Sequence, residues 1–386
     1  MTEPEHIAVV GASLAGLRTV QGLRRNGSAA RITMIGDEPE LPYDRPPLSK
    51  AVLLGKADAA SLYFVDAGTL AALEVDLRLG VAAVGLDLGS RAVRLADGTA
   101  LGFDRLVVAT GSSPRRIPGL RALPGVHVLR TAGDAAAIRA GLLHARRVAV
   151  VGGGFIGAEI ASAARELAVE ITVIDVLPTL MTRGLGAQLG ARMTELHRRN
   201  GVVLRLDSAV TDVVGDDRVT GVALGDGSVV DADLVVVGIG TVPNVGWLRG
   251  SGVPLDDGVL CDRYLRAAEE VYAVGDVARW HHPHYDRPVR MEHWTSAGEQ
   301  ATALAATLTG TPTPCTLLPY VWSEQFGRRL QIFGRIEPDD EIDLVFEEGD
   351  RFVALARRAG RLAAAVAYDA LKHALPYRLQ LVQGAR

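Results

Sequence analysis

Gly152, Gly154 and Gly157 have the spacing of a turn that binds the pyrophosphate of a dinucleotide. They follow the apolar run RVAVV and precede a stretch with helical periodicity. In such a turn the first glycine makes the bend, the second lets the backbone approach the phosphates, and the third packs the helix against the strand. Asp175 ends the next apolar run, where a carboxylate accepts from ribose hydroxyls and repels a 2′-phosphate. This favours NADH over NADPH, although Arg183 a little further on weakens the inference.

A second turn of this kind lies near the start of the chain. Gly11, Ser13 and Gly16 repeat the spacing, with serine in place of the middle glycine. One such motif is weak evidence, but both copies lie between an apolar run and a helical stretch, and a second apolar run follows each. Asp37 or Glu38 is the carboxylate expected at the ribose here. The repeat predicts two dinucleotide-binding units in one chain.

The elements that position these turns predict an α/β fold. Strand, turn, helix and strand follow one another at both copies, which indicates two Rossmann-like dinucleotide-binding domains. The apolar run at 270–278 ends in Gly275-Asp276 and has to reach the ligand of the first domain. We therefore expect the chain to leave the first domain and return to it. The predicted parts are residues 1–110 with 241–315, an inserted domain at 111–240, and a third part at 316–386.

The third part follows a different pattern and is predicted to be α+β. The segments WSEQF, RLQIFGRI, EIDLVFEE and RFVALARR have the character of successive antiparallel strands. The run LAAAVAYDALKHAL (362–375) is expected to form a terminal helix.

Composition excludes several other classes of protein. The net charge of −4 gives no support for a nucleic-acid partner. Cys261 and Cys315 are far apart, which excludes a redox-active dithiol and argues against a Cys-ligated metal. The segment 280–284 (WHHPH) is interpreted as a structural loop, and no metal site is predicted. We find no signal peptide and no apolar stretch of the ~18 residues that a membrane helix needs, so a cytoplasmic protein is expected.

Longer blocks of sequence extend over most of the chain, and they resemble one family. They are LPYDRPPLSK (41–50), ATGSSPRRIPG (109–119), LRT (129–131), GGGFIGAEIA (152–161), VGIGTVPN (237–244), YAVGDVA (272–278), MEHWTSAGEQA (291–301) and WSEQFGRRLQIFG (322–334). In content and order they are similar to the oxygenase-coupled NADH:ferredoxin reductases, the putidaredoxin reductase and biphenyl dioxygenase reductase type. The resemblance implies FAD at the first turn and NADH at the second. It also implies hydride transfer to the flavin, then single-electron transfer to an iron–sulfur ferredoxin that serves a cytochrome P450 or a ring-hydroxylating oxygenase.

The resemblance also implies roles for individual residues. It gives catalytic parts to Lys50, which would face the flavin, and to Glu159, which would lie at the nicotinamide carboxamide. From the residues alone, a solvated surface lysine and a helix-start glutamate remain open. The residues expected around FAD are Gly11, Ser13, Leu14, Ala15, Gly16, Asp37, Glu38, Arg45, Lys50, Ala82, Thr110, Gly111, Arg130, Gly275, Asp276 and Trp294. Those expected around NADH are Gly152, Gly154, Phe155, Ile156, Gly157, Glu159, Asp175, Gly238 and Gly240.

The expected partner is an acidic ferredoxin, and a monomer or weak homodimer is expected. Candidate docking residues are Arg287, Arg290, Arg328 and Arg329, which lie in flavin-side segments of the family. A rubredoxin reductase, an NADH oxidase and a redox-sensing interaction protein of the apoptosis-inducing-factor kind remain alternatives. No cysteine lies in residues 41–50, which argues against the peroxidase and CoA-disulfide branches.

Overall fold

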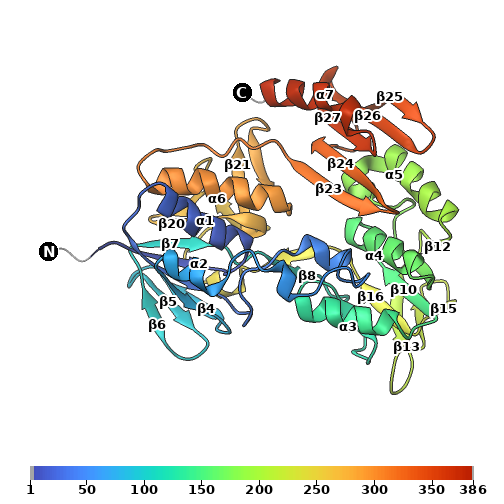
Figure 1. Cartoon of the computed structure of the whole chain (residues 1–386), viewed down its shortest axis with the longest axis horizontal. Helices are drawn as coiled ribbons and strands as arrows, with labels where there is room; N and C mark the ends of the chain where they lie inside the picture. The colour runs from blue at the N-terminus through green and yellow to red at the C-terminus, as the bar shows by residue number, and fades with distance from the viewer. Residues whose placement is uncertain (1–3, 385–386) are drawn as a thin grey trace.

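A computed structural model describes residues 4–384, and the chain is arranged around three main sheets (Figure 1). The first has six strands in the order β19-β20-β7-β1-β2-β3, parallel except for β19 at one edge. All five residues of β1 are buried, as a central strand covered on both faces requires. The strands are β1 (His6–Val10), β2 (Arg31–Ile35), β3 (Val75–Arg78), β7 (Arg105–Val108), β19 (Arg266–Ala268) and β20 (Val271–Ala273).

Segments from both ends of the first predicted domain meet in this sheet. Helices α1 (Leu14–Arg25) and α6 (Trp294–Leu308) pack side by side (Figure 1). The division of the chain at residues 110, 241 and 316 stays a proposal, which this pairing supports. Smaller elements are α2 (Ala67–Ala72), a sheet of β4 (Ala83–Asp87), β5 (Ala92–Leu95) and β6 (Ala100–Gly102), and a sheet of β18 (Val259–Cys261), β21 (Ala278–His282) and β22 (Arg287–Arg290).

The second main sheet has five parallel strands in the order β12-β11-β10-β16-β9. They are β9 (Val126–Val128), β10 (Arg147–Val151), β11 (Glu170–Ile174), β12 (Val203–Arg205) and β16 (Leu234–Val237). The helices of this part are α3 (Ala132–Leu142), α4 (Phe155–Glu166) and α5 (Thr182–Arg199). A three-stranded sheet of β13 (Val210–Val214), β14 (Gly221–Leu224) and β15 (Val229–Asp231) joins them.

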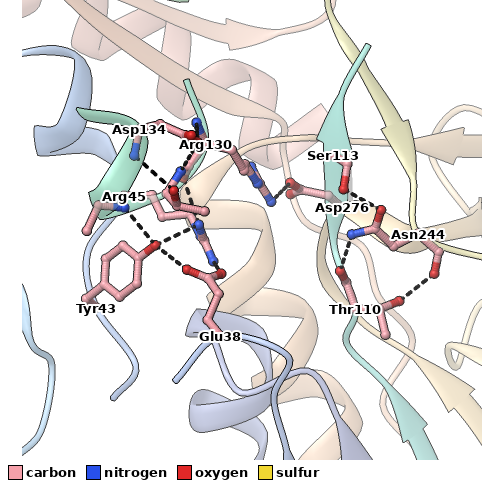
Figure 2. Close-up of polar contacts among 11 residues, drawn as sticks. Glu38, Tyr43, Arg45, Thr110, Ser113, Arg130, Asp134, Asn244 and Asp276 are labelled. Atoms are coloured by element: carbon pink, nitrogen blue, oxygen red, sulfur yellow. Dashed lines mark hydrogen bonds and ion pairs between the residues drawn. The ribbon is translucent and has the colours of Figure 1, made fainter. Parts of the chain in front are cut away.

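Two strands connect the first part to the second. β8 (Ser112–Pro114) and β17 (Thr241–Pro243) pair antiparallel where the chain leaves and returns. Asn244 ties this crossing together, because its Nδ2 donates to the Thr110 carbonyl at 2.9 Å and its Oδ1 accepts from the Ser113 hydroxyl at 2.7 Å (Figure 2). The hydrogen bonds of Asn244 therefore link the segment that leaves the first part to the segment that returns to it.

The C-terminal part is an antiparallel sheet in the order β23-β24-β27-β26-β25, packed against α4 and α5 (Figure 1). It contains β23 (Tyr320–Gln325), β24 (Arg328–Gly334), β25 (Glu341–Glu348), β26 (Arg351–Arg358), β27 (Arg361–Tyr368) and α7 (Leu371–Gly384). The helix expected at 362–375 is wrong over its first half, because residues 361–368 form the central strand and the helix begins at Leu371. An apolar run buried on both faces does not distinguish a strand from a helix by periodicity, and burial between β24 and β26 overrides the helix propensity of alanine.

Among residues 4–384, no helix has the length and apolar character needed to cross a membrane.

Candidate active site

The first glycine turn joins β1 to α1 in a shape that only glycine permits. Gly11 has φ +121°, and a Cβ on it would lie 2.1 Å from the carbonyl oxygen of Ala109. A Cβ on Gly16 would lie 2.0 Å from the Gly11 carbonyl oxygen. Ser13 is the N-cap of α1; in the described chain its hydroxyl makes no cap hydrogen bond, and the first helical turn has no acidic residue. The N–H groups at the start of α1 are therefore available to an anion.

Two cations and two carboxylates from distant segments lie beside this turn (Figure 2). Arg45 forms an ion pair with Glu38 and donates to the Arg130 carbonyl at 2.7 Å. The Tyr43 hydroxyl accepts from Arg45 at 3.0 Å and donates to Glu38 at 2.5 Å. The Arg130 guanidinium lies 3.3 Å from Asp276. The arrangement suits a ligand that carries both phosphates and hydroxyls.

The Gly275-Asp276 turn packs against the first helical turn of α1, close to this group. A Cβ on Gly275 would lie 3.0 Å from the Cβ of Ala15, in the first turn of α1. A Cβ on Gly111 would lie 3.2 Å from the Arg130 guanidinium. The return strand thus reaches the first turn, as the sequence predicts.

The other residues expected around FAD lie in varied surroundings. Leu14 is buried in the first turn of α1, and Thr110 donates to the Asn244 carbonyl at 2.9 Å. Trp294 is 39% exposed, and its Nε1 donates to Asp44 at 2.7 Å. Of the two acidic candidates for the ribose, Asp37 is exposed and Glu38 is the one in the ion-pair network. The structure does not bring Ala82 into this network; its carbonyl accepts from the Ala96 N–H at 2.9 Å.

Three residues near this turn escaped the sequence reasoning. Gln300 is fully buried and accepts from the Gly275 N–H at 2.7 Å, so it fixes the Gly275-Asp276 turn on α6. Tyr43 links Arg45 to Glu38, as described above. His293 has a buried Nδ1 without a hydrogen-bond partner in the described chain, and burial lowers its pKa. All three lie inside blocks that support the family resemblance, but only burial and contacts show what each side chain does.

The second glycine turn repeats the geometry of the first. A Cβ on Gly152 would lie 2.3 Å from the Gly238 carbonyl oxygen, and one on Gly157 would lie 2.0 Å from the Gly152 carbonyl oxygen. Gly154, the N-cap of α4, has φ −73°, and a Cβ there would meet nothing within 4 Å. Open space at the middle glycine is what a closely approaching pyrophosphate requires.

The remaining residues expected around NADH surround this space. Asp175 accepts from the Gly153 N–H at 2.5 Å and from the Leu177 N–H at 2.9 Å. Ile156 is exposed in the first turn of α4, and Phe155 packs against Gly184. A Cβ on Gly240 would lie 4.0 Å from the Arg183 guanidinium, so Arg183 lies at the edge of the same space.

A buried ion pair connects the two halves of the site. The Lys50 Nζ lies 2.8 Å from Oε2 of Glu159, and the side chains are only 13% and 5% exposed. Ser49 donates to the same oxygen, and Ser323 donates to Oε1 at 2.6 Å. The Trp322 ring centroid lies 4.9 Å from Nζ. Both side chains are largely shielded from water, and a buried carboxylate is stable only when it is paired and hydrogen-bonded.

The donor sets of both turns fit dinucleotides. Each offers a helix N-terminus held open by glycines, and each has a carboxylate after its second strand, Glu38 at the first and Asp175 at the second, where a ribose would bind. The first also has two arginines, which would suit phosphate, and the buried Nδ1 of His293, which has no hydrogen-bond partner in the described chain.

The interpretation of 280–284 as a loop is wrong for Trp280, His281 and His282, which belong to β21 and pair with β22, because the buried Trp280 and His282 fit the alternation of a strand. His282 is buried, and its ring lies 2.8 Å from the Leu317 carbonyl oxygen, while His281 lies 3.3 Å from Asp286. Among residues 4–384, no group of three or more His, Cys, Asp or Glu side chains is arranged to hold a metal ion. Cys261 and Cys315 are free and buried, and burial raises the pKa of both thiols.

Two family models together match most of the chain. Residues 5–301 match the pyridine nucleotide-disulphide oxidoreductase family, and residues 320–386 match the reductase C-terminal family. The chain is 39% identical to rhodocoxin reductase of Rhodococcus erythropolis over 331 residues, 85% of this chain and 78% of that protein. It is 38% identical to the ferredoxin reductase component of chlorobenzene dioxygenase of Cupriavidus sp. over 370 residues, 95% of this chain and 89% of that protein.

A solved structure has the same fold over nearly the full length. The crystal structure of the covalent putidaredoxin reductase–putidaredoxin complex matches with a TM-score of 0.94 and 32% identity, over 98% of this chain and 93% of that one. The chain therefore belongs to the pyridine nucleotide-disulphide oxidoreductases and is an FAD- and NAD(H)-using oxidoreductase of the putidaredoxin reductase type.

Proposed function

We propose that this chain accepts hydride from NADH and passes electrons one at a time to an iron–sulfur ferredoxin that serves an oxygenase. The observation that carries the proposal is the buried Lys50–Glu159 ion pair, which joins the segment after the first turn to the helix after the second. Relatives 36–40% identical to this chain are named as ferredoxin reductase components of dioxygenase systems.

The bound flavin supplies the chemistry that converts a two-electron donor into a one-electron donor. The protein's task is to align the two dinucleotides and to stabilise the charge that develops between them. Lys50 holds a positive charge in a site shielded from water, where it stabilises negative charge that develops on reduction. Glu159 fixes the position of that ammonium and offers its carboxylate to the carboxamide of the nicotinamide. Gly154 leaves open space in which the pyrophosphate would bind, at the start of the helix that carries Glu159.

Asp175 supports a preference for NADH. Both of its oxygens accept backbone N–H groups, so the carboxylate is held in place at the end of β11. A fixed negative charge there repels a 2′-phosphate. The free cysteines fit a reducing compartment, and we propose that the protein works in the cytoplasm.

We propose that the ferredoxin docks near Trp322. Arg329 lies 5.1 Å from the Trp322 ring, whose centroid is 4.9 Å from Lys50, so this arginine joins the buried pair to the surface. Each candidate docking arginine already forms an ion pair with a carboxylate of the same chain. An acidic ferredoxin has to compete with that carboxylate. The pairs are Arg287 with Glu337, Arg290 with Asp257 and Glu292, Arg328 with Asp350 and Asp369, and Arg329 with Glu324.

A reduction assay with and without a ferredoxin tests the function. NADH-driven reduction of cytochrome c by the purified yellow protein is expected to rise strongly when a ferredoxin from an oxygenase system is added. Equal rates with and without the ferredoxin contradict the electron-transferase role. Rapid consumption of O₂ under the same conditions favours the NADH oxidase alternative, and reduction of rubredoxin alone favours the rubredoxin reductase alternative.

Charge reversal tests the docking residues separately. Arg329→Glu is expected to raise the KM for the ferredoxin about tenfold at low salt, with little change when ferricyanide is the acceptor. Arg198→Glu is the matched control, because Arg198 is an exposed arginine on α5 that pairs with Glu195. Equal effects of the two substitutions exclude Arg329 from the docking surface.

A further inference from the structure

Ser323 brings the C-terminal sheet to the carboxylate of Glu159. It is fully buried on β23, and its hydroxyl lies 2.6 Å from Oε1. The other oxygen, Oε2, accepts from Ser49 and from Lys50. The two oxygens of Glu159 are therefore held from different directions, and Ser323 is the donor that the C-terminal sheet supplies.

Gln325 fixes the direction of this hydrogen bond. Its Nε2 lies 3.0 Å from the Ser323 oxygen. An amide NH₂ only donates, so the Ser323 hydroxyl proton is left to be donated to Glu159. A hydrogen bond to an ionised acceptor is shorter and stronger than one between neutral groups, and the distance of 2.6 Å agrees with that.

We propose that Ser323 is a positioning residue for the hydride-transfer step, an inference that rests on the proposed function. By holding Oε1, it keeps Oε2 turned toward Lys50. Without the hydroxyl, Oε1 becomes a buried acceptor that lacks this donor, so the carboxylate is free to turn. Lys50 then loses its fixed counter-charge. Trp322, the next residue on β23, contacts Lys50, so the C-terminal sheet touches both members of the ion pair.

The test compares three variants of the FAD-loaded protein. Ser323→Ala removes the hydroxyl, and Ser323→Thr keeps it. Ser162→Ala is the matched control, because Ser162 lies on α4 and accepts from the Phe326 N–H at 2.6 Å, at the same interface but without contact to Glu159.

The expected result separates the rate from binding. Ser323→Ala reduces the single-turnover rate of flavin reduction by NADH about tenfold, while the dissociation constant of NAD⁺ changes by less than about twofold. Ser323→Thr and Ser162→Ala keep the wild-type rate.

A second measurement does not depend on NADH. In a Lys50→Met/Glu159→Leu background no carboxylate is left for Ser323, so Ser323→Ala is expected to lower the thermal midpoint in the wild-type background and not in this one. Equal lowering in both backgrounds, or a Ser323→Ala variant with the wild-type rate, overturns the proposal. If NADH does not reduce the wild-type protein, the proposed function fails instead, and the midpoints still decide whether Ser323 holds Glu159.

Discussion

The Nζ of Lys50 and Oε2 of Glu159 lie 2.8 Å apart although 109 residues separate them in the chain. Lys50 follows the short 3₁₀ turn Pro46–Ser49, and Glu159 lies in the second turn of α4. Both glycine turns start helices, and this pair lies between the segments that follow them. Its burial makes each charge depend on the other.

Lys50→Met is expected to slow the reduction of the flavin by NADH between about tenfold and a hundredfold, because the positive charge at the site is lost. Stopped-flow absorbance of the flavin measures this rate. Lys56→Met is the matched control, since Lys56 forms an exposed ion pair with Glu166 that spans the same two parts of the chain. A wild-type rate in Lys50→Met removes Lys50 from the mechanism.

Alanine substitutions at two glycines of the second turn are expected to affect different properties, NADH binding in one case and stability in the other. Gly154→Ala places a methyl group in open space and is expected to leave the thermal midpoint unchanged while raising the KM for NADH about tenfold. Gly157→Ala places a methyl group 2.0 Å from the Gly152 carbonyl oxygen and is expected to destabilise the protein by about 1–3 kcal/mol. An unchanged KM in Gly154→Ala contradicts the assignment of NADH to this turn.

Asp175→Asn removes the charge of this side chain and keeps its size. The amide oxygen keeps the hydrogen bond from the Gly153 N–H, while the amide NH₂ cannot replace the bond from the Leu177 N–H, so one of the two hydrogen bonds is retained. The ratio of kcat/KM for NADPH to that for NADH is expected to rise about tenfold, because the repulsion of the 2′-phosphate is removed. Steady-state kinetics with both nucleotides measure the ratio. An equal loss of kcat/KM with NADH and with NADPH would show that Asp175 only supports the turn.

His197 predicts a loss of stability in mild acid. It is fully buried on α5, and burial lowers its pKa below the ordinary value of 6.5. As the pH falls through that value the unfolded chain binds a proton that the folded chain does not, so stability falls with pH in this range. His197→Leu is expected to reduce the slope of the free energy of unfolding against pH by at most about 1.4 kcal/mol per pH unit.

Thermal midpoints between neutral and mildly acidic pH test this, with His144→Leu, an exposed histidine, as the control for loss of a histidine. The same pH dependence in wild type and in His197→Leu assigns the acid sensitivity to other groups.

Sequence patterns predicted much of the architecture, because each glycine turn is a local feature bounded by apolar runs. The helix expected at 362–375 failed over its first half, because Val366 and its alanine neighbours are buried on both faces of a central strand and have no diagnostic periodicity. The parts that Ser323 and Gln300 play could not be predicted, since they depend on side chains that meet across 164 and 25 residues of chain. The resemblance placed Glu159 near the flavin lysine, but only the structure shows its three donors.

An anaerobic titration tests the central claim most directly. The purified protein is expected to be yellow, and one equivalent of NADH is expected to bleach the visible flavin absorbance, which an oxidised iron–sulfur ferredoxin then restores while it becomes reduced. A colourless protein, or a flavin that NADH does not bleach, contradicts the account. A bleached flavin that the ferredoxin leaves reduced contradicts the electron-transfer step alone.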